Sequence, residues 1–270
     1  MKVQTPFRYP GAKNKLLPII EEYLIQLGIE QQSKFADVFV GGGSVLLRVA
    51  EKYPNIELYG NDKDYWIASF WQIVSNNDNY KLFELFKLMD QPVTLEHFYK
   101  LRETPPLSDI EAAYYAIFFN RTSFSGILSS GPIGGKKQLS KYTVDCRWNL
   151  NKLKEKILKC HNLLKGRTTI DNLDYIKYNI LTSTDCIAYC DPPYFIKGDM
   201  LYSEKMSKSC HLALADILNK RKNWLLSYDD DPYIRNLYKN QNIVDLATRY
   251  CINGEKSSWQ SKNELLIYGI

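Results

Sequence analysis

The chain has 270 residues, of which 45% are hydrophobic and 24% charged, and its formal net charge is +5. This composition is typical of a globular protein with one large domain, or of a core domain with an insert. No stretch approaches the roughly 18 apolar residues of a membrane span, and the N-terminus lacks the apolar core of a signal peptide, so we expect a cytoplasmic protein with no membrane contact.

The first third of the chain predicts a βαβ unit that binds a ligand. After a helical pattern over residues 16–27, an apolar, β-prone stretch at residues 35–40 runs into the glycine-rich residues 41–44. A helix and a second strand at residues 56–60 follow, and this strand closes on Asp62. Glycines let the backbone approach a ligand, and an acid about 20 residues further on binds ribose hydroxyls. Neither GxGxxG nor GxxxxGKS is present, so the pattern favours a nucleoside ligand with a non-phosphate tail; a glycine-rich turn without a ligand is the alternative.

The middle of the chain predicts a mostly helical insert. Residues 66–101 and 111–120 have helical periodicity, residues 121–137 form a glycine-punctuated loop, and Asn149 is placed to cap a further helix. Beyond it, strands and helices alternate again. The predicted division is a core domain of residues 1–70 and 168–270 and an insert of residues 71–167.

Positive charge is concentrated within this insert. From residue 136 to residue 168 there are ten Lys or Arg against two acids, a local excess of +8. Such a concentration is what binding to a phosphate backbone requires. A solvated lysine-rich helix face is the alternative.

The last third contains the motif with the most chemistry. An apolar run at residues 186–190 leads directly into Asp191, Pro192, Pro193 and Tyr194. This reads as a buried strand that ends at a carboxylate, a rigid turn and an aromatic ring, at the sheet edge where ligands bind. Asp191 and a backbone carbonyl can hold the two hydrogens of an exocyclic amine while Tyr194 stacks on its ring; a strand simply ended by prolines is the alternative. Further strands at residues 224–228 and 265–268 complete a doubly wound α/β sheet.

Three stretches in this order resemble the Dam-like, α-group DNA adenine-N6 methyltransferase family. They are residues 7–18, residues 37–44 and residues 191–194, and residues 119–126, 226–230 and 264–266 are supporting matches. The resemblance extends over essentially the whole chain. It implies a Rossmann-like methyltransferase sheet with an inserted target-recognition domain, S-adenosylmethionine as the cofactor and double-stranded DNA as the partner. No metal is expected, since the six cysteines and three histidines show no zinc spacing. We expect a monomer and leave open whether a restriction endonuclease accompanies it in a restriction-modification system.

The resemblance also assigns residues. Tyr9 and Lys13 would lie by the cofactor, Asp37 and Phe39 would line its methionine end, and Asp62 would hold its ribose. The full set of expected cofactor-binding residues is Tyr9, Lys13, Asp37, Phe39, Gly41, Gly43, Asp62, Asp174 and Tyr175. The expected catalytic residues are Asp191, Pro192, Pro193 and Tyr194, and the expected DNA-binding residues are Arg121, Ser129, Lys136, Lys137, Lys141 and Arg147.

One departure from the family bears on specificity. Members that methylate GATC have an arginine where Ser129 stands in this chain. Arginine reads guanine with two hydrogen bonds and serine cannot, so we predict a target other than GATC. Alternatives are methylation of cytosine N4, for which Asp191 is the less usual first residue of the motif, and a methyltransferase-like protein that binds DNA or cofactor without turnover. An NAD-dependent oxidoreductase is disfavoured by the lack of GxGxxG.

Overall fold

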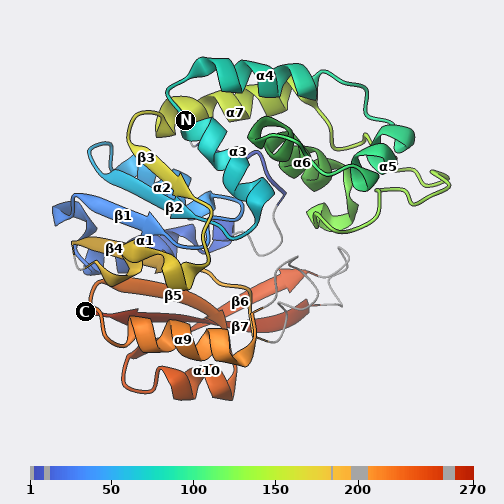
Figure 1. Cartoon of the computed structure of the whole chain (residues 1–270). Coiled ribbons are helices and arrows are strands. Elements are labelled where there is room, and N and C mark those ends of the chain that lie inside the picture. Colours follow the sequence, from blue (N-terminus) through green and yellow to red (C-terminus); the bar gives the residue numbers. More distant parts are fainter. Residues whose placement is uncertain (1–2, 9–12, 184, 196–205, 252–258) are drawn as a thin grey trace.

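The computed structural model describes residues 3–8, 13–183, 185–195, 206–251 and 259–270, which form a seven-stranded sheet with helices on both faces (Figure 1). The strand order is β3-β2-β1-β4-β5-β7-β6. Strands β3, β2, β1, β4 and β5 run parallel to one another, and β7 is antiparallel to both β5 and β6. This architecture confirms the predicted α/β class. The strands are β1 (Lys34–Asp37), β2 (Glu57–Asn61), β3 (Thr168–Asp171), β4 (Cys186–Cys190), β5 (Trp224–Asp229), β6 (Asn242–Cys251) and β7 (Trp259–Gly269).

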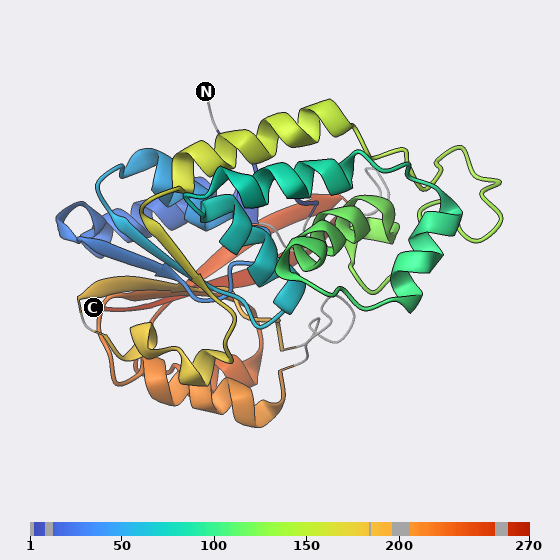
Figure 2. The ribbon, with the colours of Figure 1, turned by 45° about the horizontal axis from the view of Figure 1, so that its top comes forward.

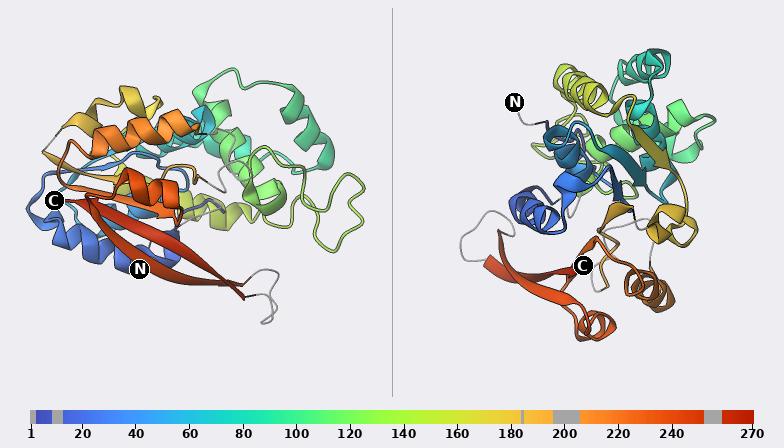
Figure 3. Two further views of the ribbon diagram at one scale, coloured as in Figure 1. Left: turned by 90° about the horizontal axis from the view of Figure 1, so that it is seen from below. Right: turned by 90° about the vertical axis from the view of Figure 1, so that its left-hand side faces the viewer.

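The central strands are apolar throughout because both of their faces are covered. Every residue of β4 and β5 is buried. Alternate residues belong to two separate cores: Tyr189 and Leu225 pack with α1 (Leu17–Gln26) and α2 (Ser44–Lys52). Cys190 and Leu226 pack on the other face with α9 (Lys208–Leu218) and α10 (Pro232–Leu237). Figure 3 shows these two helical layers on opposite sides of the sheet.

The strand order reverses between β1 and β4. From β1 the chain proceeds outward to β2 and β3, and after β4 it proceeds the other way to β5. Asp37 at the end of β1 is in register with Tyr189, two residues before Asp191. Ligands of open α/β sheets bind at the carboxyl ends of strands beside such a reversal. The reversal therefore brings Asp37 and Asp191 to the edge where a site is expected.

The helices between β2 and β3 form a layer beyond one end of the sheet (Figures 1 and 2). They are α3 (Tyr65–Ser75), α4 (Asn79–Met89), α5 (Leu95–Glu103), α6 (Asp109–Thr122) and α7 (Leu150–Leu164). Helix α6 is buried along most of its length because α3, α4 and α5 pack around it. The side chain of Asn149 accepts a hydrogen bond from the backbone N–H of Lys152 at 3.2 Å, which confirms the predicted helix cap. Residue 71, where the insert was predicted to begin, falls inside α3.

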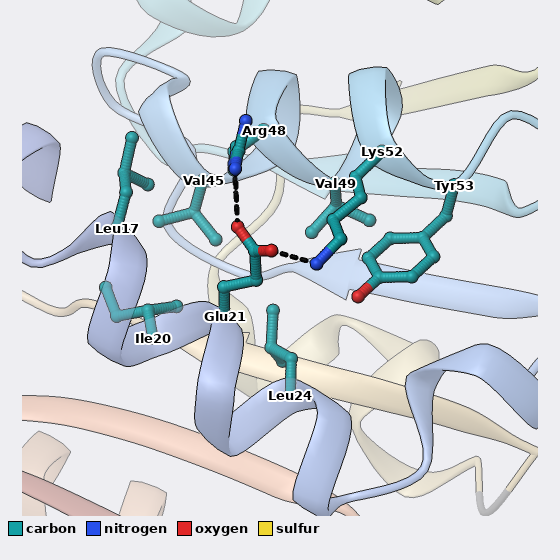
Figure 4. Close-up of a pocket in the computed structure, with 9 residues that line it drawn as sticks. All are labelled: Leu17, Ile20, Glu21, Leu24, Val45, Arg48, Val49, Lys52 and Tyr53. Carbon is teal, nitrogen blue, oxygen red and sulfur yellow. Dashed lines mark hydrogen bonds and ion pairs between the residues drawn. The ribbon is translucent and has the colours of Figure 1, made fainter.

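Helices α1 and α2 are joined by an ionic contact over an apolar seam. Figure 4 shows the Glu21 carboxylate of α1 between Arg48 and Lys52 of α2, with Leu24 below it and Val49 beside Lys52. The Glu21 carboxylate lies 2.7 Å from the Arg48 guanidinium, and the two cations lower its pKa. The hollow at this seam measures about 10 Å³, about the size of one water molecule, so its role is packing.

Gly43 is required by the turn between β1 and α2. Its φ is +71°, and a β-carbon at this position would overlap the ring of Trp71. We predict that Gly43→Ala lowers the free energy of unfolding by about 2–4 kcal/mol, through left-handed backbone strain and overpacking. Gly131→Ala is the matched control, because a β-carbon at Gly131 has no neighbour within 4 Å. Equal unfolding midpoints in urea for the two variants would contradict the prediction.

Candidate active site

The ends of three neighbouring strands place carboxylates at one edge of the sheet. Asp37 ends β1, Asp62 follows β2 and Asp191 follows β4. Asp37 is 2% exposed and the Asp191 side chain 18% exposed. Three carboxylates that lie close together and are largely shielded from water repel one another. They are unfavourable unless cations or hydrogen-bond donors lie beside them.

Asp191 has a cationic partner from the N-terminal part of the chain. The Lys13 ammonium lies 2.7 Å from the Asp191 carboxylate and donates a hydrogen bond to Oδ2. The same ammonium lies 4.8 Å from the centre of the Tyr194 ring. Burial raises the pKa of Asp191, and the charge of Lys13 opposes that rise. Lys13 thus favours the ionised form of Asp191, which can accept hydrogen bonds on both oxygens.

The turn after Asp191 is held by the end of β5. The rings of Tyr194 and Tyr228 stack with centroids 6.0 Å apart, and the Tyr228 hydroxyl is hydrogen-bonded to His211 Nδ1. The backbone N–H of Phe195 donates to Asp229 Oδ1 at 3.2 Å. His211, Tyr228 and Asp229 were not among the site residues expected from the sequence. The family resemblance includes residues 226–230, and this match is the signal by which Tyr228 and Asp229 could have been found.

The glycine loop is tied to Asp62. The backbone N–H of Gly41 donates to Asp62 Oδ2 at 2.8 Å, and the N–H of Asp64 donates to Oδ1 at 2.9 Å. Burial, followed by the charge of Asp64, raises the pKa of Asp62 to about 7. The carboxylate therefore lies directly beside the loop formed by Gly41 and Gly43, as the predicted βαβ unit requires.

Asp37 is the most perturbed carboxyl group of the site. Burial raises its pKa to about 8, and the negative charge of Asp191 contributes in the same direction. Its Oδ1 atom is buried and has no hydrogen-bond partner in the part of the chain that the structure describes. A buried carboxyl oxygen without a partner costs free energy unless a ligand donates to it, so Asp37 is the natural contact for a cationic group.

An aromatic pair lies at this edge of the sheet, formed by Phe39 after β1 and Tyr175 after β3. The rings of Phe39 and Tyr175 are 5.5 Å apart, and the Tyr175 hydroxyl donates to the carbonyl of Cys210 at 2.5 Å. Asp174 lies 3.3 Å from the Lys63 ammonium and accepts a hydrogen bond from Ile176 N–H. The structure therefore brings together Lys13, Asp37, Phe39, Gly41, Gly43, Asp62, Asp174 and Tyr175 around one edge; Tyr9 lies outside the described residues.

The six expected DNA-binding residues occupy two environments. Ser129, Lys136, Lys137, Lys141 and Arg147 are exposed. Ser129 and Lys136 line a cavity of about 630 Å³ together with Phe124. Arg121 is half-buried, and its guanidinium donates to the carbonyl of Pro6. Burial lowers the pKa of Arg121 to about 10.

The buried Asn120 and the half-buried Arg102, which were not among the expected site residues, hold the loop of Ser129. Asn120 is fully buried; it accepts from Arg8 N–H at 2.7 Å and donates to the carbonyl of Gly126 at 3.0 Å. Arg102 stacks on Phe119 and donates to the carbonyls of Leu128 and Ser130. Asn120 belongs to the resemblance, whereas nothing local in the sequence distinguishes Arg102 from other helix-face arginines.

Within the described ranges, no three His, Cys, Asp or Glu side chains form a group suited to a metal ion. No helix in the same ranges is long and apolar enough to cross a bilayer.

Comparison with known proteins identifies the family. A family model described as D12 class N6 adenine-specific DNA methyltransferase matches residues 9–252. The chain is also similar to the type II methyltransferase M.MjaIII of Methanocaldococcus jannaschii, with 25% identity over 213 residues that cover 72% of this chain and 70% of the relative. The chain belongs to the D12 class family: it is an N6-adenine-specific DNA methyltransferase, which acts on DNA with a methyl donor. The predicted Dam-like family is thereby confirmed.

Proposed function

We propose that the chain methylates an adenine that is flipped out of duplex DNA at a specific sequence, with S-adenosylmethionine as the methyl donor. The observation that carries this proposal is the juxtaposition, at one sheet edge, of Asp37, Asp62 and the Lys13–Asp191 pair. Asp191 would face the exocyclic amine of the adenine, and Asp37 and Asp62 would face S-adenosylmethionine, which is a cationic nucleoside. We expect a cytoplasmic monomer.

The residues at this edge fit S-adenosylmethionine. Asp37 would accept from the ammonium of the methionine end, which supplies the missing partner of Oδ1. Asp62 would hold the ribose beside Gly41 and Gly43, and Phe39 with Tyr175 would flank the adenine ring, with Asp174 beside it. When bound, the cofactor supplies an electrophilic methyl group on a sulfonium.

Asp191 and the turn after it would prepare the target amine. The N6 lone pair of adenine is delocalised into the ring and is a poor nucleophile. Hydrogen bonds from its two hydrogens to Asp191 and to the Pro192 carbonyl draw the nitrogen toward tetrahedral geometry, and Pro193 fixes the turn. Tyr194 stacks on the base and offsets an unstacking cost of a few kcal/mol. The negative charge of Asp191 also stabilises the positive charge that develops on the nitrogen.

Lys13 would have two roles in this cycle. Its charge favours the ionised form of Asp191, whereas burial favours the protonated carboxyl group. Its ammonium also donates to the oxygens that the adenine amine must reach, so the base and Lys13 compete for Asp191. We therefore expect base entry to shift Lys13 away from at least one carboxylate oxygen.

The insert would bind DNA. We propose that residues 71–167 form the target-recognition domain, with residues 1–70 and 168–270 as the catalytic domain. Arg121, Lys136, Lys137, Lys141 and Arg147 would bind phosphates, and Ser129 would face the bases.

The test is transfer of labelled methyl from S-adenosylmethionine to unmethylated genomic DNA, followed by separation of the product nucleosides. We expect all label in N6-methyladenine. Cofactor binding without any label in DNA would overturn the proposed transfer of methyl to duplex DNA, whereas label in another nucleoside would overturn the assignment of Asp191 to the adenine amine.

We predict that the target is not GATC. An exposed serine at position 129 cannot make the bidentate contact by which arginine reads guanine. Plasmid methylated to completion by this protein should therefore remain fully sensitive to an endonuclease that cuts only unmethylated GATC. Full protection of the plasmid would contradict the prediction.

A further inference from the structure

A second polar cavity lies on the other side of the segments that form the active site. It measures about 410 Å³ and is lined by residues 3–8, by the first turns of α1 and α2, by the end of α6 and by α7. Lys13 contacts Asp191, whereas its neighbour Asn14 lines this cavity. Gly43 belongs to the loop beside Asp62, and the next residue, Ser44, lines the cavity. The cavity is therefore separate from the methyl-transfer site.

The cavity is lined by cations that no carboxylate neutralises. Arg8, Arg121 and Lys156 line it and form no ion pair within the described part of the chain, and no acidic side chain belongs to its wall. The other cation of its wall, Arg48, is paired with Glu21 at 2.7 Å. Burial lowers the pKa of Lys156 and the charge of Arg121 lowers it further, which reflects uncompensated positive charge. An anion would relieve this repulsion.

Three side chains that line the cavity each have a donor atom without a partner among the described residues. These atoms are Arg8 Nη1, Arg121 Nε and Ser44 Oγ, and all three are buried. Buried donors of this kind are costly to leave unsatisfied. Ser44 is also the first residue of α2, where backbone N–H groups favour negative charge. Two guanidinium groups, one ammonium and one hydroxyl around a common space form a donor set suited to a phosphate.

We propose that this cavity binds a phosphate group of the DNA backbone, at a distance from the base that is methylated. The inference rests on the proposed DNA-binding role of the insert. DNA is the favoured source because positive charge continues outward from the cavity: Arg147 is exposed and close enough to lower the pKa of Arg8, and α7 carries further exposed lysines. A free phosphate anion has the same chemistry and is distinguished below.

The test compares two neutralised lysines of α7 in the full-length protein. Lys156 lines the cavity, whereas Lys159 lies one turn away and pairs with Glu155 at 2.5 Å. Affinity for a short duplex would be measured from 50 to 200 mM salt. Lys156→Gln should reduce the slope of log affinity against log salt by about 0.9, which is about a threefold smaller loss of affinity over this range. Lys159→Gln, the matched control, should keep the wild-type slope.

An uncharged variant gives a second measurement. Ser44→Ala removes one orphaned donor without changing net charge, and it should weaken duplex binding by up to about tenfold at constant salt. Equal slopes for the two lysine variants, together with unchanged binding by Ser44→Ala, would overturn the proposal.

Inorganic phosphate separates the two sources of the anion. Phosphate should raise the melting temperature of DNA-free wild type above that in chloride of equal ionic strength, and Lys156→Gln should abolish the difference. If Lys156→Gln abolishes this difference while the salt slopes of duplex binding are equal in the two lysine variants, the cavity binds a free anion and its assignment to DNA is wrong. Methyl transfer at saturating DNA by the control variant Lys159→Gln should equal that of the wild type. If the wild type itself transferred no methyl from S-adenosylmethionine to DNA, that result would contradict the proposed function and not the phosphate site.

Discussion

Asp191→Ala should lower the single-turnover rate of methyl transfer by at least about a thousandfold, while binding of S-adenosylmethionine changes little. The carboxylate is the group that orients the adenine amine and stabilises charge on it, so its loss raises the barrier without affecting the cofactor contacts proposed for Asp37 and Asp62. Asp191→Asn should retain more activity than Asp191→Ala because the amide oxygen still accepts one hydrogen bond.

The matched control is an aspartate at the opposite end of the same strand. Asp185 precedes β4, is exposed and pairs with Lys34 at 2.6 Å. Asp185→Ala should transfer methyl at the wild-type rate. Removal of Asp191 also removes the carboxylate that pairs with the buried Lys13, which can destabilise the fold by about 3–5 kcal/mol. Cofactor binding by calorimetry therefore serves as the test of folding. A folded, cofactor-binding Asp191→Ala protein with near-normal rates would remove Asp191 from the mechanism.

The elements that were predicted from sequence are those with a strong local pattern. Strands β4 and β5 are continuous apolar runs, and α6 and α7 have clear periodicity with a polar cap at the start. The predicted helical stretch 66–101 proved to be three helices, since Asp78 and Thr94 cap new helices within it. The predicted first strand, residues 35–40, ends earlier, at Asp37, where the glycine-rich turn begins.

Strands β3 and β6 were not predicted, because tertiary pairing determines them. β3 has four residues with only Ile170 buried, and its hydrogen bonds to β2 join segments more than 100 residues apart. β6 lies at the edge of the sheet, and its position depends on antiparallel pairing with β7, the next strand along the chain. Neither has the apolar run by which a buried strand is recognised.

The same distinction applies to the site. Carboxylates at strand ends could be anticipated, since the ends of parallel strands gather at one edge. The pairing of Lys13 with Asp191 spans 178 residues, and that of Asn120 with Arg8 spans 112. Nothing local encodes such contacts. The donor atoms without partners at the proposed phosphate-binding cavity could not be predicted either, because they come from the N-terminal segment, α2 and α6.

Binding of S-adenosylmethionine should release close to one proton at pH 7, and its affinity should rise about tenfold per pH unit up to about pH 8. The cause is Asp37, whose pKa burial raises to about 8, so that the carboxyl group is mainly protonated in the ligand-free protein at pH 7. A cofactor ammonium beside it favours the ionised form and lowers the pKa in the complex. Calorimetry in two buffers of different ionisation enthalpy counts the released protons directly and does not depend on activity.

The sign can be checked in the ligand-free protein as well. A carboxyl group whose pKa is raised on folding binds more protons in the folded than in the unfolded state between about pH 4 and pH 8. Stability should therefore fall as the pH rises through this window, and Asp37→Asn should flatten the fall while abolishing most of the proton release. Asp185→Asn removes a carboxylate whose pKa is about 2, already ionised throughout, and should change neither quantity. Proton release that persists in Asp37→Asn would transfer the linkage to Asp62, whose pKa of about 7 makes it the other carboxyl group that titrates in this range.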